Sequence, residues 1–204
     1  MFVGYSRIVM KKILAALLFL FSIYSINTNA FEPNNLNICN VSRPAKNNYE
    51  PEKFSPSNNL LRLPGREEFY CGQKILLKLT LKDKNCVPIS DAKIYIWQVG
   101  CDGKYPYKPL RTKCDEKLLN IESKSSFVGH GTATSNNLGH ANFITIYPPG
   151  KYNQEFINIR IAHPLYGTFQ TQIKMSHDKV LNMGKYDVVS ESITLPWEDI
   201  RRRY

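Results

Sequence analysis

The sequence lacks most of the features that mark a helical protein or a structural metal site. It has no heptad repeat and few long stretches of Ala, Glu, Lys and Leu, but it contains 12 Pro, 11 Gly and 12 Tyr. This composition is typical of a strand-rich fold with many turns and argues against a helical bundle or coiled coil. The five cysteines include no Cys-x-x-Cys pair and form no cluster with the four histidines, so a structural zinc site is not expected. A Gly-x-Ser-x-Gly motif is also absent, which leaves serine hydrolysis without support.

Long apolar runs are missing as well, except near the N-terminus. Three basic residues between positions 7 and 12 precede an apolar run of about 14 residues, 13–26, and small residues follow at 28–30. This order is typical of a secretory signal peptide spanning 1–30, and the run is shorter than the ~20 residues that cross a bilayer. We expect export and cleavage, a mature chain from Phe31 without a transmembrane span, and a periplasmic or secreted location.

The charge is moderately basic and dispersed. The whole chain carries +10, and the mature chain would keep 24 basic and 17 acidic residues. The only dense basic run, Arg201-Arg202-Arg203, has no interleaved aromatics, so no nucleic-acid partner is expected. The excess instead favours an anionic envelope surface or a small anionic ligand.

All five cysteines lie in the expected mature chain. In an oxidising compartment they are disulfide candidates, and their odd number leaves at least one thiol free or able to pair between chains in a homo-oligomer. Cys86 and Cys101 flank a strand-like run. A bridge between them would close a loop of about 15 residues, worth on the order of 3 kcal/mol in the chain-entropy model. We therefore predict a Cys86–Cys101 disulfide, with the pairing of the other cysteines left open.

Alternation of apolar and polar residues predicts an antiparallel β-sandwich. From Gln73 to Lys82 every second residue is Ile or Leu, which is the period of a half-buried strand. Six further segments of β-rich composition are separated by turn residues such as Asn136-Asn137 and Asp102-Gly103. They cover residues 92–99, 126–133, 140–147, 156–163, 169–175 and 188–195.

Composition also divides the mature chain. Residues 31–65 are rich in Asn, Pro and Ser and have no apolar period, so we expect an extended arm that stays outside the hydrophobic core, except for a tether near Cys39 if that cysteine pairs. The sandwich domain is expected over 66–178. Residues 179–204 form a C-terminal extension with a basic end.

Several segments in order resemble the intradiol ring-cleavage dioxygenases. They are Gly72 to Leu81, Cys86-Val87-Pro88-Ile89, Ala92 to Gln98, Asp102-Gly103-Lys104-Tyr105, Phe143 to Tyr152 with its Pro-Gly-x-Tyr, and Thr171-Gln172 followed by Asp178. The resemblance covers about residues 66–178. It implies the antiparallel β-sandwich of that family, and an enzyme that holds Fe(III) with two tyrosinates and two histidines and cleaves catechol-like aromatics with dioxygen.

Two of the four ligand positions that the resemblance implies hold the residues of the family, and the other two hold different residues. Tyr105 and Tyr152 stand at the positions of the two tyrosine ligands, and phenolate suits a ferric ion. The His-x-His of the family, six and eight residues after the second tyrosine, is replaced by Asn158 and Arg160. An amide oxygen is a weak ligand, and a guanidinium stays protonated and repels the metal. Glu155 stands where the family has a substrate-facing arginine.

The four histidines are not expected to replace the missing ligands. His163 lies five residues beyond Asn158, an odd offset that turns it to the other face of a regular strand. His130 and His140 flank a polar turn, and His177 follows the Thr-Gln strand. We interpret them as turn or solvated residues.

Three alternative functions are consistent with this sequence. The chain is an exported intradiol dioxygenase whose iron sphere is completed by other groups, or an exported binding module that has lost the iron. In the second case Arg160 occupies the old pocket and pairs with the carboxylate or phosphate of a small aromatic or anionic ligand. The third is a structural envelope protein assembled through its arm and an unpaired cysteine. Iron content per chain separates the first from the other two.

Overall fold

The strands that alternation predicts are present in the computed structural model. The model describes residues 38–46, 49–111, 113–176, 178, 180–183 and 186–197. The expected signal peptide, His177 and the arginine run at 201–203 lie outside the described residues. The strands are β1 Lys74–Lys82, β2 Lys93–Trp97, β3 His130–Thr134, β4 His140–Ile146, β5 Phe156–His163, β6 Gly167–Lys174, β7 Val180–Met183 and β8 Tyr186–Thr194.

Strand β1 illustrates how the sequence period becomes a sheet face. Ile75 and Leu77 are fully buried and the pattern continues to Leu79 and Leu81, while Lys78 between them is exposed. Side chains alternate across a strand, so one face of β1 is continuously apolar. At roughly 25 cal/mol per Å² of buried apolar surface, this face drives the packing of one sheet on the other.

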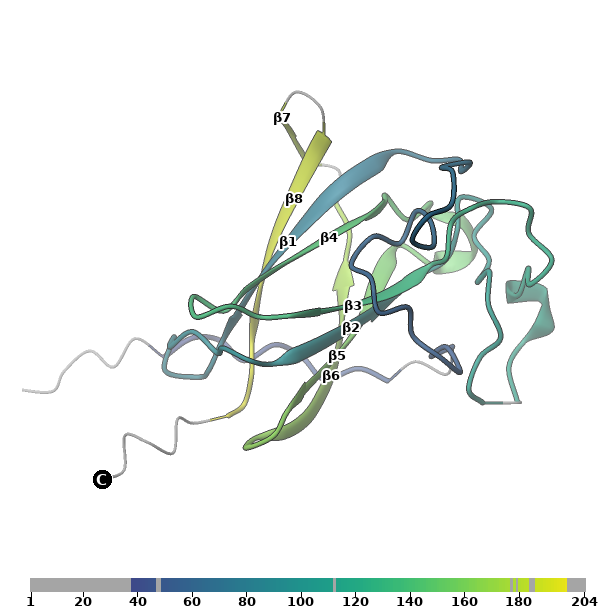
Figure 1. Cartoon of the computed structure of the whole chain (residues 1–204). Coiled ribbons are helices and arrows are strands. Elements are labelled where there is room, and N and C mark those ends of the chain that lie inside the picture. Colours follow the sequence, from purple (N-terminus) through teal and green to yellow (C-terminus); the bar gives the residue numbers. More distant parts are fainter. Residues whose placement is uncertain are drawn as a thin grey trace, which may run out of the picture. The chain divides into compact units, whose positions relative to one another are not determined.

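The strands form two four-stranded sheets, in the orders β4-β1-β8-β7 and β3-β2-β5-β6 (Figure 1). All pairings are antiparallel except that of β1 with β8, which run parallel with Ile75 opposite Asp187. The β-sandwich expectation is therefore confirmed, with one parallel ladder added. Strand β7 was not predicted.

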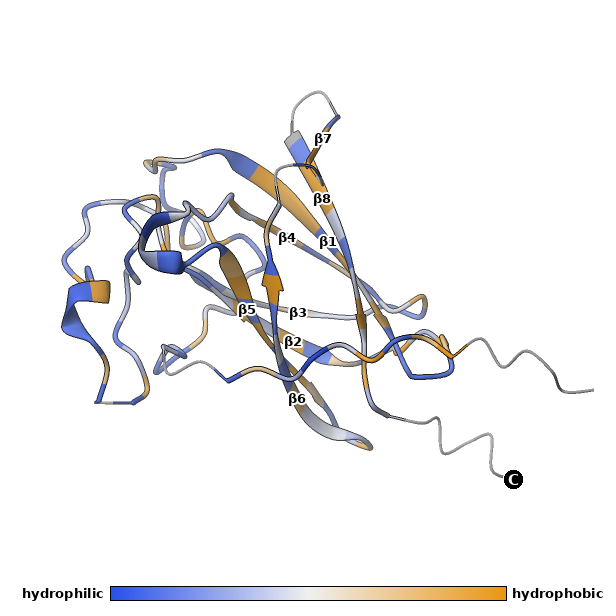
Figure 2. Ribbon diagram, turned by 180° about the vertical axis from the view of Figure 1, so that it is seen from behind, coloured by the Kyte–Doolittle hydropathy of each residue, from blue (hydrophilic) through white to orange (hydrophobic). Residues whose placement is uncertain are grey.

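The core lies between the two sheets. Apolar colouring is concentrated on strands such as β1 and β5, whereas the connecting loops are mainly polar (Figure 2). Ile94 and Ile96 of β2 belong to the same buried cluster as Phe143 of β4. The helical segments that are described over their full length are two short 3₁₀ turns, Glu116–Leu118 and Lys151–Asn153. No helix in the described ranges is long and apolar enough to cross a membrane.

The arm expectation is wrong for its last residues. Leu60 and Leu61 are fully buried in the core, although they show no period in the sequence. Asn59 forms a bridge with Ile144 of β4, and Leu60 N–H donates to the Ile144 carbonyl at 2.8 Å. These backbone bonds hold the segment against the edge strand of one sheet and turn both leucines inward. The tether near Cys39 is present, because Cys39 is disulfide-bonded.

The predicted Cys86–Cys101 disulfide is wrong. Cys39 pairs with Cys86 at a Cα separation of 5.3 Å, and Cys71 pairs with Cys101 at 5.8 Å. The physical reason is β2, which lies between Cys86 and Cys101 in the chain. An extended strand of this length advances about 16 Å, well beyond the roughly 4.4–6.8 Å that a disulfide permits between Cα atoms. Cys114 takes part in neither bridge, and its thiol donates to the Arg111 carbonyl at 3.1 Å.

Long loops gather beyond one end of the strands (Figure 1). They include the segment 49–72, which precedes β1, and the segment 98–129, which connects β2 to β3. Parts of both loops pack on the outer face of the β3-β2-β5-β6 sheet, where a second apolar cluster forms around Trp97 and Tyr105. This covered face carries the residues that the sequence singles out.

Candidate functional site

A row of four side chains crosses the outer face of the β3-β2-β5-β6 sheet. Trp97 of β2 lies opposite His130 of β3 on one side and Asn158 of β5 on the other. Asn158 in turn lies opposite Gln172 of β6. Residues opposite each other point to the same face, and Arg160 joins them because it lies two residues beyond Asn158. The positions at which the family has His-x-His are therefore on this face.

Asn158 is fully buried and its amide is engaged on both sides. Its Nδ2 donates to the Trp97 carbonyl at 3.1 Å and, at 3.5 Å, to the hydroxyl of Tyr105. Its Oδ1 accepts a hydrogen bond from Gln172 Nε2 at 2.9 Å. The side chain is thus held by protein groups, as a buried amide requires.

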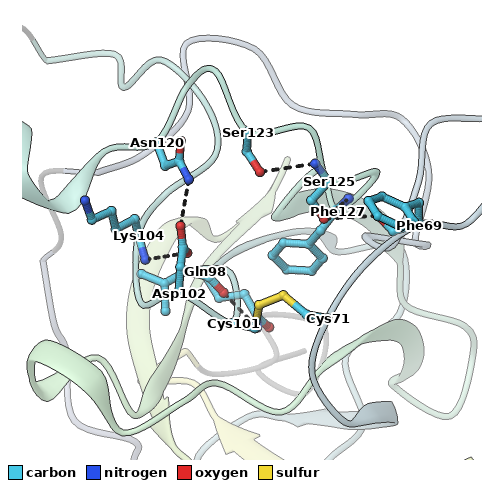
Figure 3. The surroundings of a disulfide bond; sticks show 11 residues. Phe69, Cys71, Gln98, Cys101, Asp102, Lys104, Asn120, Ser123, Ser125 and Phe127 are labelled. Carbon is cyan, nitrogen blue, oxygen red and sulfur yellow. Dashed lines mark hydrogen bonds between the residues drawn. A yellow bond between two sulfur atoms is a disulfide. The ribbon is translucent and has the colours of Figure 1, made fainter.

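Tyr105 reaches this face through the turn that follows β2. Gly103 has φ +80°, and Lys104 N–H donates to the Asp102 carboxylate at 3.0 Å, so the chain reverses within a few residues. Figure 3 shows Asp102 receiving this bond and a second one from Asn120. Tyr105 is fully buried, and its hydroxyl donates to Gln154 Oε1 at 3.0 Å. The phenol therefore lies inside a network of neutral amides.

Tyr152 occupies a different environment from Tyr105. It lies in the second 3₁₀ turn with left-handed φ of 54°, and its side chain is 60% exposed. Its ring covers Gly103, where an added Cβ would lie 2.9 Å from a ring carbon. Within the described residues its hydroxyl has no hydrogen-bond partner. The two tyrosines that the resemblance pairs are thus separated into one buried and one exposed side chain.

Arg160 is fixed by the arm. Its guanidinium forms an ion pair with the Glu50 carboxylate at 2.9 Å. It also lies 4.3 Å from the ring centroid of Tyr95 and 5.4 Å from that of Phe54. An ion pair combined with two cation–π contacts holds the side chain in place along the sheet.

Aromatic residues of the arm cover the rest of the face. The ring of Tyr49 stacks on that of Tyr105 with centroids 4.6 Å apart and planes 8° apart. Phe54 contacts Trp97 edge to face at 5.8 Å. The Tyr107 hydroxyl donates to the Tyr49 carbonyl at 3.0 Å, and burial, with smaller contributions from Tyr105 and Glu50, raises the pKa of Tyr107 well above its ordinary value. The face is consequently closed by rings from the segment that was expected to be an arm.

Two buried polar atoms on this face have no hydrogen-bond partner. Among the described residues of this face they are the indole Nε1 of Trp97 and the Nε of Arg160. Each is a donor, and an unpaired buried donor costs about 1–3 kcal/mol. Neither can act as a metal ligand, because each nitrogen carries a proton and no available lone pair.

The histidines are dispersed among different surroundings. His130 belongs to the row above, is 9% exposed, and accepts a hydrogen bond at Nδ1 from Ser55 N–H at 2.9 Å. Burial lowers its pKa to about 4. His163 lies against Tyr166 at the end of β5, and His140 is exposed at the start of β4 in the other sheet. In the described ranges no group of three or more His, Cys, Asp or Glu side chains could hold a metal ion.

Several residues of the site were not found from the sequence. Glu50, Phe54 and Tyr49 come from a segment without any period, so only the tertiary structure reveals their contacts. Gln172 was visible as part of the Thr-Gln pair, but without a role. His130 was interpreted as a turn residue, and its position opposite Trp97 depends on strand pairing.

The comparisons with known proteins agree with the architecture. No family model matches the sequence. A protein of Rickettsia felis named "Putative dioxygenase" is 43% identical over 193 residues, which are 94% of this chain and 92% of the relative. A Rickettsia typhi protein of the same kind is 41% identical over 168 residues, 82% of this chain and 81% of the relative. The chain belongs to the intradiol ring-cleavage dioxygenase family.

Solved structures of dioxygenases share the fold of this family member. An intradiol ring-cleavage dioxygenase from Tetranychus urticae superposes with a TM-score of 0.52 at 24% identity, covering 69% of this chain and 67% of that one. The dioxygenase domain of a carbohydrate-binding fusion protein from Streptomyces sp. SirexAA-E gives 0.55 at 13% identity, covering 76% and 98%. Identities this low establish the β-sandwich alone.

The donor set of this dioxygenase-family chain does not fit a ferric ion. Of the four ligand positions of the family, one holds the buried phenol of Tyr105, which is hydrogen-bonded to an amide, and another holds the exposed phenol of Tyr152. The other two hold an amide bonded to protein groups and an ion-paired guanidinium. At an effective dielectric of 20, a guanidinium about 4 Å from a cation is repelled by about 4 kcal/mol for each unit of metal charge. The guanidinium of Arg160 would therefore repel a ferric ion at the position where the family has its second histidine ligand.

Proposed function

We propose that this chain is an exported member of the dioxygenase family that does not hold iron at the family site and acts as a binding module. The observation that carries the proposal is the engagement of Arg160 with Glu50 and the rings of Tyr95 and Phe54. A fixed positive charge replaces a ligand, and a carboxylate of the same chain already neutralises it. The position is thus an internal structural contact.

The closure of the face supports the same function. Tyr105 and Asn158 are both 0% exposed, and Tyr49 stacks directly on the Tyr105 ring. Ring cleavage needs an opening large enough for an aromatic substrate and dioxygen beside the metal. The packing of 49–54 on this face leaves these two side chains out of contact with solvent.

Export is part of the proposal. The N-terminal order of basic, apolar and small residues favours a cleaved signal peptide. The disulfides Cys39–Cys86 and Cys71–Cys101 support an oxidising compartment, where such bonds persist.

A second candidate is ring cleavage itself, which the names of the rickettsial relatives favour. It would require Fe(III) bound by a ligand set other than the four family positions. Catechol-like aromatics would then be the substrates, as the family resemblance implies.

Metal analysis of the purified protein decides between the two. We expect less than a stoichiometric amount of iron after loading and dialysis, no visible tyrosinate-to-iron charge-transfer band, and no oxygen uptake with catechol. Tyr105→Phe and the control Tyr95→Phe should then be indistinguishable from wild type in iron content. Stoichiometric iron, with a band that Tyr105→Phe abolishes and Tyr95→Phe retains, would establish the second candidate instead.

A further inference from the structure

A groove of about 440 Å³ lies at the His130 end of the row that also contains Trp97 and Asn158. Its floor includes His130, Tyr107 and Phe127, and its rim includes Leu63 and Phe69. We call it the His130 groove. The volume falls within the roughly 300–1,000 Å³ of sites for small organic ligands.

The walls of the groove are tied together by backbone and hydroxyl bonds. Phe69 N–H donates to Ser126 Oγ at 2.8 Å, and Ser126 N–H donates to the Phe69 carbonyl at 2.6 Å. Ser126 Oγ also donates to the carbonyl of the buried Leu61 at 2.7 Å. Figure 3 shows Phe69 and Phe127 beside the Cys71–Cys101 disulfide, which joins the same two loops. The groove is thus formed before any ligand arrives.

His130 supplies an unused donor to the groove. Its Nδ1 accepts from Ser55 N–H, so in the neutral imidazole the proton lies on Nε2. The edges of Phe54 and Tyr107 fix the ring, with centroids 6.0 and 5.0 Å away. Nε2 has no acceptor among the described residues, although the side chain is only 9% exposed. Among the described residues Nε2 is not one of the fully buried atoms that lack a partner, so an acceptor that enters the groove can reach it.

The rim supplies positive charge and apolar contact. Arg66 and Lys124 line the groove, and neither has an ion-pair partner in the described part of the chain, while Glu67 contributes one carboxylate. Phe69 is 74% exposed and Leu63 49%. An exposed aromatic ring beside two cations favours an anion that carries an aromatic ring.

We propose that the His130 groove binds a small aromatic carboxylate. Its ring lies between Phe69 and the floor, its charge is complemented by Arg66 and Lys124, and one of its oxygens accepts from His130 Nε2. This binding gives the proposed module a ligand class. It is independent of iron, because Asn158 lies two strands away from His130 in the sheet.

Calorimetric titration of the purified protein tests the site, with benzoate as the probe. Benzoate should bind saturably at one site per chain, with benzamide and acetate at least about tenfold weaker because they lack the charge or the ring. Arg66→Ala/Lys124→Ala should weaken benzoate about tenfold, and Phe69→Ala about fivefold. The matched controls Lys78→Ala and Leu165→Ala, exposed on other strands or turns, should bind as wild type.

A second readout keeps the test independent of folding defects. In ¹⁵N-labelled wild-type protein, saturating benzoate should shift the His130 Nε2 resonance and leave that of His140 unchanged. Absence of saturable benzoate binding would overturn the proposal. So would equal affinity for benzamide, or binding that the double charge variant and Phe69→Ala both leave unchanged. The iron content of the protein enters none of these outcomes, so this proposal and the iron-free function can fail separately.

Discussion

Protonation of His130 should make the stability of this protein fall in mildly acidic solution. Burial lowers the pKa of His130 from 6.5 to about 4 in the folded chain, so the unfolded chain binds more protons between these values. The free energy of unfolding is therefore unaffected above pH 6.5 and decreases as the pH falls toward 4. At 1.36 kcal/mol per pKa unit, the loss between pH 7.5 and 4.5 is about 2.5 kcal/mol.

The substitution His130→Asn isolates this effect. Asparagine can keep an acceptor for Ser55 N–H, which in the wild type donates to Nδ1 at 2.9 Å, but it does not titrate. Urea unfolding at pH 7.5 and 4.5 should show the wild type losing about 2.5 kcal/mol more than the variant over this interval. His140→Asn, at an exposed position on β4, serves as the control and should follow the wild type. Parallel losses in the wild type and His130→Asn would refute the reasoning.

Two further predictions concern the segment before β1. Leu60→Ala should lower the free energy of unfolding by about 2–5 kcal/mol because it opens a cavity in the core, whereas Leu63→Ala, at a half-exposed rim position, should cost much less; equal urea midpoints for the two variants would contradict this. Cys39→Ser/Cys86→Ser opens a loop with a sequence separation of 47 and should cost about 4 kcal/mol in the chain-entropy model. A loss below about 1 kcal/mol by urea unfolding under oxidising conditions would show that the arm is held by other contacts.

The strands could be predicted because their burial is periodic. The apolar positions of β1 and of β5 recur with the pleat, so the sequence itself identifies the inward face. β7 could not be predicted, because Val180–Met183 is only four residues long and its strand character depends on pairing with β8. The burial of Leu60 and Leu61 also escaped, because two adjacent residues carry no period and backbone bonds to β4 decide where they point.

The site could be predicted only in part. Spacing along β5 correctly placed Asn158 and Arg160 on one face, and His163 lies apart from them. The partner of Arg160 could not be predicted, because Glu50 reaches it from more than a hundred residues away in the chain. Cysteine pairing failed for a related reason. Nearness in sequence favoured Cys86 with Cys101, but the intervening strand separates them.

The parallel pairing of β1 with β8 also governs the order in which the molecule can be assembled. β8 lies between β1 and β7 in the sheet. The sheet that contains β1, which begins at residue 74, is therefore complete only when residues 186–194 have paired with it. Contacts across such separations form slowly, because the long intervening chain must be ordered first. A nascent chain that ends before residue 186 leaves one edge of β1 without its partner, with Leu77 and Leu79 beside unpaired backbone groups. A chain that lacks residues 186–194 therefore cannot complete this sheet.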